Sequence, residues 1–183
     1  MRLRRLEAEF GERLCVEWRS FLLRPRPDPG RTLEKFRAYT QSWLRPASDE
    51  DAGTFRVWQS DEGPPSHSIP PHLVAKAAAA LGADAFQRMH ERLLHAYFAE
   101  NHDITNTGTL AALWREAGLP DTEFARHEHP ILLQQTLAEH NEAIDIGVTG
   151  VPAARMEGND AIIVGAQPLE LYRHWITRAR TSE

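Results

Sequence analysis

The sequence predicts an α/β fold in which a helix and a strand, a long helical block, a β-hairpin and a closing helix follow one another. Three observations lead to this order. Residues 14–22 alternate between apolar and polar side chains, residues 70–146 are rich in helical signals, and two apolar runs after residue 150 flank a turn. The 183 residues are 42% hydrophobic, which suffices for one compact unit but not for two large independent domains.

The first element is predicted to be a helix over Met1–Phe10, because its apolar residues recur at helical spacing and Gly11 supplies a stop. Residues 14–22 are then predicted to form a strand, with Glu17 and Arg19 on the face opposite its apolar side chains. Closely spaced prolines after this segment break regular structure, since each proline fixes its own backbone dihedral angle.

The helical block is expected to begin with a helix that Thr32 caps and Arg45–Pro46 ends. A loop over residues 47–65 should follow, anchored by a few aromatic contacts. Further helices are expected over residues 70–82, 83–99, 110–117 and 131–146, with a short helical piece from Asp121. Thr107 or Thr109 is the expected cap of the third of these helices.

The last part of the chain changes character. Two apolar runs, 150–156 and 161–164, flank the turn-forming segment Glu157–Asp160, which predicts a β-hairpin. Gln167–Pro168 should then begin a terminal helix, because proline suits the first turn of a helix.

The charge balance argues against nucleic-acid and membrane partners. The 21 basic residues face 26 acidic ones, a formal net charge of -5, so the protein has no global basic field. The longest near-apolar run, Leu73–Gly82, is too short to cross a bilayer. Met1–Phe10 lacks the apolar segment of a secretory signal, and we therefore expect a cytoplasmic protein.

The only cysteine is Cys15, so this chain contains neither a Cys-x-x-Cys pair nor a cysteine zinc cluster. A lone cysteine in a strand is expected to be a small buried hydrophobic residue. The histidines do not have metal-ligand spacing: His90 and His95 point to different helix faces, and His127 and His129 lack a third ligand. We therefore expect no metal site.

Several motifs resemble one protein family. Gly147–Ala153, which contains Gly-Val-Pro, and the Gly-Ala-Gln-Pro of Gly165–Pro168 resemble DsbA-family proteins of the FrnE type, in the thioredoxin superfamily. Weaker similarity lies at Ala96–Glu100 and His67–Gly82, in the helical block, and at Trp18–Leu22 near the start. The family is also related to 2-hydroxychromene-2-carboxylate isomerases.

This resemblance implies a thioredoxin-like fold with a helical insertion. Residues 1–30 and 147–183 would form the thioredoxin-like core and residues 31–146 the insertion, within a single compact unit. The family's first strand and its active-site turn are expected upstream of Met1, which stands where a reactive thiolate would open the first helix. No catalytic residue is therefore expected in the chain as given.

The resemblance also implies a substrate-binding element. Pro152 would follow a cis peptide bond, and the backbone of Val151 would pair with an extended substrate or with glutathione. Gly150 and Gln167 would complete this element, and the N–H groups around Gln167 could hold a carboxylate, although a plain helix cap explains them equally well.

Three functions are open at this point. The first is a DsbA-like thiol–disulfide oxidoreductase, with a thiol or disulfide protein as substrate. The second is a glutathione-dependent isomerase or transferase, with glutathione as cosubstrate. The third is a non-catalytic binding module. In each case we expect no resident cofactor, no nucleic-acid or membrane partner, and a possible homodimer.

Overall fold

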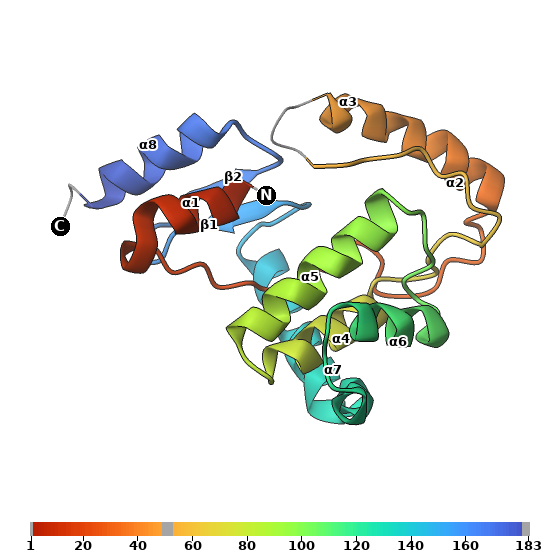
Figure 1. Ribbon diagram of the computed structural model, residues 1–183. Helices are drawn as coiled ribbons and strands as arrows, with labels where there is room; N and C mark the ends of the chain where they lie inside the picture. The colour runs from red at the N-terminus through yellow and green to blue at the C-terminus, as the bar shows by residue number, and fades with distance from the viewer. Residues whose placement is uncertain (1, 49–52, 181–183) are drawn as a thin grey trace. The chain divides into compact units, whose positions relative to one another are not determined.

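The structure is a computed structural model that describes residues 2–48 and 53–180. The chain divides into two compact units, Met1–Phe21 with Glu139–Glu183 and Leu22–Ala138. Most of the described residues are helical, and they contain one two-stranded sheet (Figure 1). None of their helices is long and apolar enough to cross a membrane. The domain boundaries inferred from the resemblance stay a prediction.

The first unit is built on the predicted β-hairpin. Strand β1 (Ala153–Arg155) pairs antiparallel with β2 (Ile162–Val164), and Ala153 lies opposite Val164. Helices α1 (Arg2–Phe10) and α8 (Leu169–Arg180) supply the buried residues of its core, which are Leu6, Leu169, Tyr172 and Ile176. Ala154, Met156 and Ile163 of the hairpin pack against this cluster. One face of the hairpin is therefore covered.

A salt bridge joins the two helices of this unit at their exposed side. Arg173 Nε of α8 lies 2.8 Å from Glu9 Oε2 of α1. The hydrogen bond to Glu9 raises the pKa of Arg173 above its usual value. Because both side chains are exposed, this pair orients the helices more than it stabilises them.

The predicted strand at residues 14–22 is wrong. No residue of this segment belongs to a strand, although Leu14, Val16 and Trp18 are half-buried and alternate with exposed neighbours as predicted. A strand is defined by the neighbour that accepts and donates its backbone hydrogen bonds, and the described part of the chain offers none here.

Helix α7 (Pro130–Asp145) holds this segment instead. The N–H of Ser20 donates to Glu139 Oε2 at 2.7 Å, and Arg19 Nη1 lies 2.9 Å from Glu142 Oε2. Partial burial lowers the pKa of Arg19, but its ion pairs with Glu17 and Glu142 outweigh this and raise it. Side chains of a helix thus replace a strand ladder.

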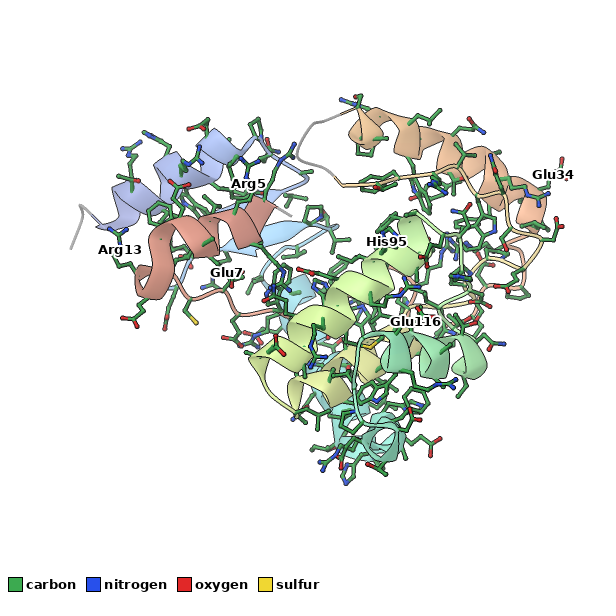
Figure 2. The ribbon with its side chains drawn as sticks, in the orientation of Figure 1. Arg5, Glu7, Arg13, Glu34, His95 and Glu116 are labelled. Carbon is green, nitrogen blue, oxygen red and sulfur yellow. The ribbon has the colours of Figure 1, made fainter. Side chains whose placement is uncertain are left out.

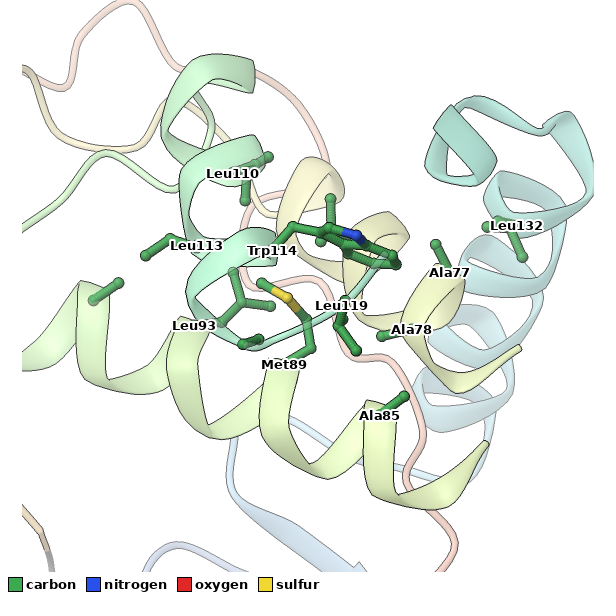
Figure 3. Packing of buried hydrophobic residues seen from close by; sticks show 13 residues of the cluster. Ala77, Ala78, Ala85, Met89, Leu93, Leu110, Leu113, Trp114, Leu119 and Leu132 are labelled. Carbon is green, nitrogen blue, oxygen red and sulfur yellow. The ribbon is translucent and has the colours of Figure 1, made fainter. Parts of the chain in front are cut away.

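The second unit contains most of the helices. They are α2 (Leu33–Thr40), η2 (Gln41–Trp43), α3 (Leu44–Ala47), α4 (Ile69–Ala79), α5 (Ala83–Phe98), α6 (Thr107–Glu116) and η3 (Asp121–Glu128). Its larger core surrounds Trp114, which is fully buried beside Met89 and Leu93 of α5 (Figure 3). The indole Nε1 of Trp114 donates to the carbonyl of Pro120 at 2.9 Å, so its polar atom is satisfied.

A second cluster in this unit is aromatic. Its buried members are Phe36, Trp43 and Trp58, and the rings of Phe36 and Trp58 lie 4.9 Å apart. The hydroxyl of Thr40 accepts from the backbone N–H of Trp58 at 3.0 Å. The predicted loop is therefore anchored by aromatic contacts, as expected, except that residues 49–52 lie outside the described residues.

Helix ends follow their capping residues with small differences from the prediction. Thr32 caps α2 by accepting from the N–H of Lys35 at 3.3 Å. Helical structure continues past Arg45–Pro46 to Ala47, because a proline in the first turn of a helix does not interrupt it. Asn106, rather than Thr107 or Thr109, caps α6 through the N–H of Thr109.

Two arginines of α5 fasten it to the end of α6. Arg92 Nε lies 2.7 Å from Oε2 of Glu116, the last residue of α6, which Figure 2 labels. Arg88 Nη1 donates to the carbonyls of Ala117 and Gly118, which the end of a helix leaves without partners. Gly118 has a φ of +66°, in the left-handed region.

Replacing Gly118 by alanine should destabilise the protein more than the same change at Gly158. Both glycines have a left-handed φ, +66° and +71°, which costs a residue with a Cβ about 1–2 kcal/mol. A Cβ at Gly118 would also lie 2.9 Å from Arg88 Nη1, which would have to move and lose its hydrogen bonds to the carbonyls of Ala117 and Gly118. A Cβ at Gly158 would meet nothing within 4 Å. Denaturant unfolding of both variants measures the difference in the free energy of unfolding. Equal losses of stability would contradict a role for the hydrogen bonds of Arg88 to the end of α6.

Candidate functional site

The segment that leads into the site begins at the end of α7. Gly147 has a φ of +89°, and its N–H donates to the carbonyl of Ile144 at 2.9 Å. The N–H of Val148 donates to the carbonyl of Ala143 at 2.9 Å. This pair of hydrogen bonds is a Schellman motif, for which glycine is the preferred residue. Gly147 therefore ends the helix five residues before Pro152.

Val151 and Pro152 lie at the open end of the hairpin. The peptide bond between them is cis. The carbonyl of Pro152 accepts from the N–H of Gly165 at 2.8 Å, which continues the pairing of Ala153 with Val164 by one residue. Pro152 has no N–H to return, so this pair contains a single hydrogen bond.

This hydrogen bond determines where the neighbouring backbone groups point. In an antiparallel ladder, hydrogen-bonded pairs alternate with pairs whose N–H and C=O groups face away from each other. Because Pro152 bonds to Gly165, Ala154 bonds to Ile163, and the backbone groups of Val151, Ala153 and Arg155 face away from β2. Within residues 2–48 and 53–180, no strand pairs with that edge of β1, and no group hydrogen-bonds to the backbone of Val151.

The loop after β2 brings Gln167 to the same end of the hairpin. Gly165 has a φ of +85°, and its carbonyl accepts from the hydroxyl of Tyr172 at 3.3 Å. The side-chain amide of Gln167 donates to the carbonyl of Val164 at 3.0 Å. The side chains of Gln167, in the loop, and of Tyr172, in α8, thus hold the loop just before α8 begins at Leu169.

The structure therefore bonds Gly165 to Pro152 and holds Gln167, two residues later in the same loop, to the carbonyl of Val164. Gly150 precedes them in the chain, and a Cβ there would meet nothing within 4 Å, so no close packing requires a glycine. Tyr172 was not identified from the sequence, where it is one apolar position of a helix. No helical spacing links it to Gly165, because α8 begins only at Leu169, so no local signal in the sequence suggested the hydrogen bond.

The hairpin face that points away from the cluster of α1 and α8 carries exposed apolar side chains at its open end and the exposed Arg155 nearer the turn. Val151 is 47% exposed and Val164 is 40% exposed, although both are large hydrophobic residues. Ala153, opposite Val164, and Ile162, opposite Arg155, lie on the same face and are half-buried. The open end of the hairpin thus combines unpaired backbone groups with apolar side chains.

The start of α1 is positively charged. Its first turn carries arginines and no acidic residue, and the guanidinium of Arg4 lies 5.7 Å from the ring centre of Trp18. Figure 2 shows Arg5 and Glu7 further along this helix. Met1, where the resemblance would place a reactive thiolate, lies outside the described residues.

Cys15 is exposed, and the prediction that it is buried was wrong. It lies between Leu14 and Val16, which are half-buried, and shares the outward side with Glu17 and Arg19. The alternation of half-buried and exposed side chains along this segment determines that Cys15 is exposed, although free cysteines are generally buried. Across the described ranges, no three side chains of His, Cys, Asp or Glu are grouped so that they could hold a metal ion.

The comparisons with known proteins agree with this architecture. Residues 1–177 match the family model of the DSBA-like thioredoxin domain. The chain belongs to this family. As a DSBA-like thioredoxin domain it has a thioredoxin-like fold that is mostly helical with a small two-stranded sheet, consistent with an α/β fold with a helical insertion. No curated protein sequence matches the chain.

Two solved structures have the same fold as this DSBA-like domain. A candidate protein disulfide isomerase from Nitrosomonas europaea superposes with a TM-score of 0.81 at 16% identity, covering 100% of this chain and 89% of that one. The cytosolic disulfide reductase DsbM from Pseudomonas aeruginosa superposes with a TM-score of 0.72 at 19% identity, covering 99% and 89%. At these identities the likeness establishes the fold alone.

The exposure of Cys15 predicts that its thiol reacts with a maleimide in the folded protein without denaturant. Cys15→Ser should change the free energy of unfolding by less than about 0.5 kcal/mol, as surface substitutions do. Leu6→Ala, at a fully buried position, is the control and should cost about 2–5 kcal/mol. Labelling that requires denaturant would contradict the exposed position.

Proposed function

We propose that this chain acts in thiol–disulfide exchange as a DsbA-like protein of the FrnE type, and that its own residues hold the substrate. The observation that carries this proposal is the exposed Val151, whose backbone groups face away from β2 and have no partner in the described part of the chain. The backbone of an extended substrate segment, next to the substrate's cysteine, would accept a hydrogen bond from the N–H of Val151 and donate one to the carbonyl of Val151.

The family and the solved neighbours support this reaction class. The chain belongs to the DSBA-like thioredoxin domains, and its neighbours are a candidate disulfide isomerase and a disulfide reductase. The latter is a cytosolic protein, which supports the cytoplasm as the proposed compartment. Glutathione is a second ligand for the same site, because its cysteinyl residue also presents a backbone N–H and a backbone C=O to Val151.

The chemistry available to these residues limits the role. A dithiol cycle needs two cysteines that alternate between a thiol pair and a disulfide, and the sequence contains one. Cys15 follows η1 (Gly11–Arg13), a short 3₁₀ helix, and therefore has no helix N-terminus to stabilise a thiolate. We therefore assign binding, and not electron transfer, to these 183 residues.

Replacing Val151 by proline removes the N–H that the substrate would use. We expect Val151→Pro to weaken binding of a peptide with a central S-methylcysteine roughly fivefold to tenfold, the worth of one hydrogen bond. Val151→Thr has nearly the same shape and keeps the N–H, so it should bind normally. Isothermal titration or chemical-shift mapping measures both, and equal affinities of the two variants would contradict recognition through the backbone.

The purified chain should have no dithiol oxidase or disulfide isomerase turnover, since one cysteine cannot hold both redox states of a pair. Insulin reduction and refolding of scrambled ribonuclease measure these activities. Turnover that Cys15→Ser abolishes would overturn the assignment of a purely binding role.

A further inference from the structure

We propose that Arg31 and Tyr97 bind the carboxylate or phosphate group of a small organic anion, and that the exposed ring of Tyr39 contacts the apolar part of the same ligand. All three residues belong to the second unit, Leu22–Ala138. The inference goes beyond the proposed function and does not depend on it.

The loop before α2 holds the side chain of Arg31 in one orientation. The N–H of Arg31 donates to the carbonyl of Asp28 at 3.1 Å, and the N–H of Gly30 donates to Asp28 Oδ1 at 2.9 Å, which makes a turn of the kind that aspartate favours. Arg31 Nη1 donates to the carbonyl of Pro65, and the guanidinium carbon lies 4.1 Å from the ring centre of Phe36. A guanidinium fixed in this way loses little freedom when a ligand binds.

No carboxylate balances the charge of Arg31. The arginines on either side of it in the chain are paired, Arg24 with Asp28 at 3.2 Å and Arg37 with Asp61 at 2.8 Å. Arg31 is half-buried, and within residues 2–48 and 53–180 it forms no ion pair. Partial burial of a charge without a counter-ion is unfavourable, and a guanidinium has N–H donors to spare for an anion besides the one that it gives to the loop.

Tyr97 of α5 places a hydroxyl group beside this guanidinium. Its ring packs in the aromatic cluster, with centres 6.4 Å from Phe36 and 5.2 Å from Trp43. Burial raises the pKa of Tyr97, although the charge and hydrogen bond of Arg31 and the charge of Arg24 act to lower it. The hydroxyl therefore keeps its proton at neutral pH and can donate to an anion, at a point where two positive charges act together.

Tyr39 provides an apolar surface next to the charged group. Its side chain is 59% exposed, and its ring stacks on Phe36 with centres 6.1 Å apart and planes 19° apart. Phe36 thus contacts both Arg31 and Tyr39. Residues 24–37 contain five basic and two acidic side chains in a chain whose formal net charge is -5, so this part of the surface favours an anion locally.

The first experiment varies the ligand and leaves the protein unchanged. The probes are phenyl phosphate and benzoate, the ring-free anions inorganic phosphate and acetate, and the neutral benzyl alcohol, in about 0.15 M salt to screen non-specific attraction. In nitrogen–proton NMR spectra, the two aromatic anions should shift the Nε–H signal of Arg31 saturably and should bind roughly twofold to tenfold tighter than the ring-free anions. Benzyl alcohol should not shift this signal. The tighter of the two aromatic anions identifies phosphate or carboxylate as the preferred group.

The second experiment varies the protein with a matched pair of arginines. Arg31→Gln should weaken phenyl phosphate about tenfold to a hundredfold, the effect of losing hydrogen bonds to a charged group. Arg26→Gln removes the same charge from an exposed position in the same loop and should weaken it less than about twofold. Tyr97→Phe keeps the ring and should cost roughly twofold to tenfold. Tyr39→Ala should weaken phenyl phosphate and leave inorganic phosphate unchanged.

The outcomes decide the inference without reference to the site at Val151. Equal losses in Arg31→Gln and Arg26→Gln would show attraction by the overall charge of the loop and would overturn it. Absence of a saturable shift at Arg31, or binding of benzyl alcohol as tight as that of benzoate, would also overturn it. Where Arg31→Gln does not fold, as circular dichroism shows, Tyr97→Phe and the Arg31 signal of the unchanged protein decide.

Discussion

The hydrogen bond from the N–H of Gly165 to the carbonyl of Pro152 is the interaction on which the rest of the site depends. It fixes the register at the open end of the hairpin, and the register decides which backbone groups bond to β2 and which face away. A shift by one residue would turn the backbone of Val151 inward and would exchange the two faces of the hairpin. The proposed binding site at Val151 would then be lost.

The hydrophobic core of the first unit reinforces the same register. Leu6 of α1 and Tyr172 of α8 are buried in one cluster, against which Ala154 and Ile163 pack as a pair on one face of the hairpin. Tyr172 also donates to the carbonyl of Gly165 at 3.3 Å. Packing and hydrogen bonding therefore specify one arrangement, which is how a two-stranded sheet, weak by itself, becomes well defined.

The sequence was most informative where structure depends on neighbours along the chain. Caps and stops located the helices to within a few residues. Thr32 caps α2 through the N–H of Lys35, three positions away, and Gly11, with a φ of +57°, directly follows the end of α1. The hairpin was found for the same reason. The segment of residues 14–22 was not, since its apolar alternation describes one face of an extended chain but cannot supply the partner that makes it a strand.

The candidate site was predictable only in part. Pro152 and Gln167 came from a family resemblance. The structure bonds them to neighbouring residues of β2 and its loop, Gly165 and Val164, but their role in binding stays a prediction. The contribution of Tyr172 depends on a contact across seven residues that no local rule supplies. The exposure of Cys15, in contrast, follows from a local pattern. The alternation of apolar and polar side chains places Cys15 on the same outer side as Glu17, whereas the general burial of free cysteines predicts the wrong position.

Amide hydrogen exchange, resolved residue by residue, tests the central claim most directly. In the chain alone, the N–H groups of Gly165 and Ala154 should be protected, and those of Val151, Ala153 and Arg155 should exchange rapidly. Binding of a substrate peptide with a central S-methylcysteine should protect the N–H of Val151. Protection of Val151 and Ala153 in the chain alone, or exchange at Gly165 as fast as at Ala153, would contradict the register and with it the account of the site.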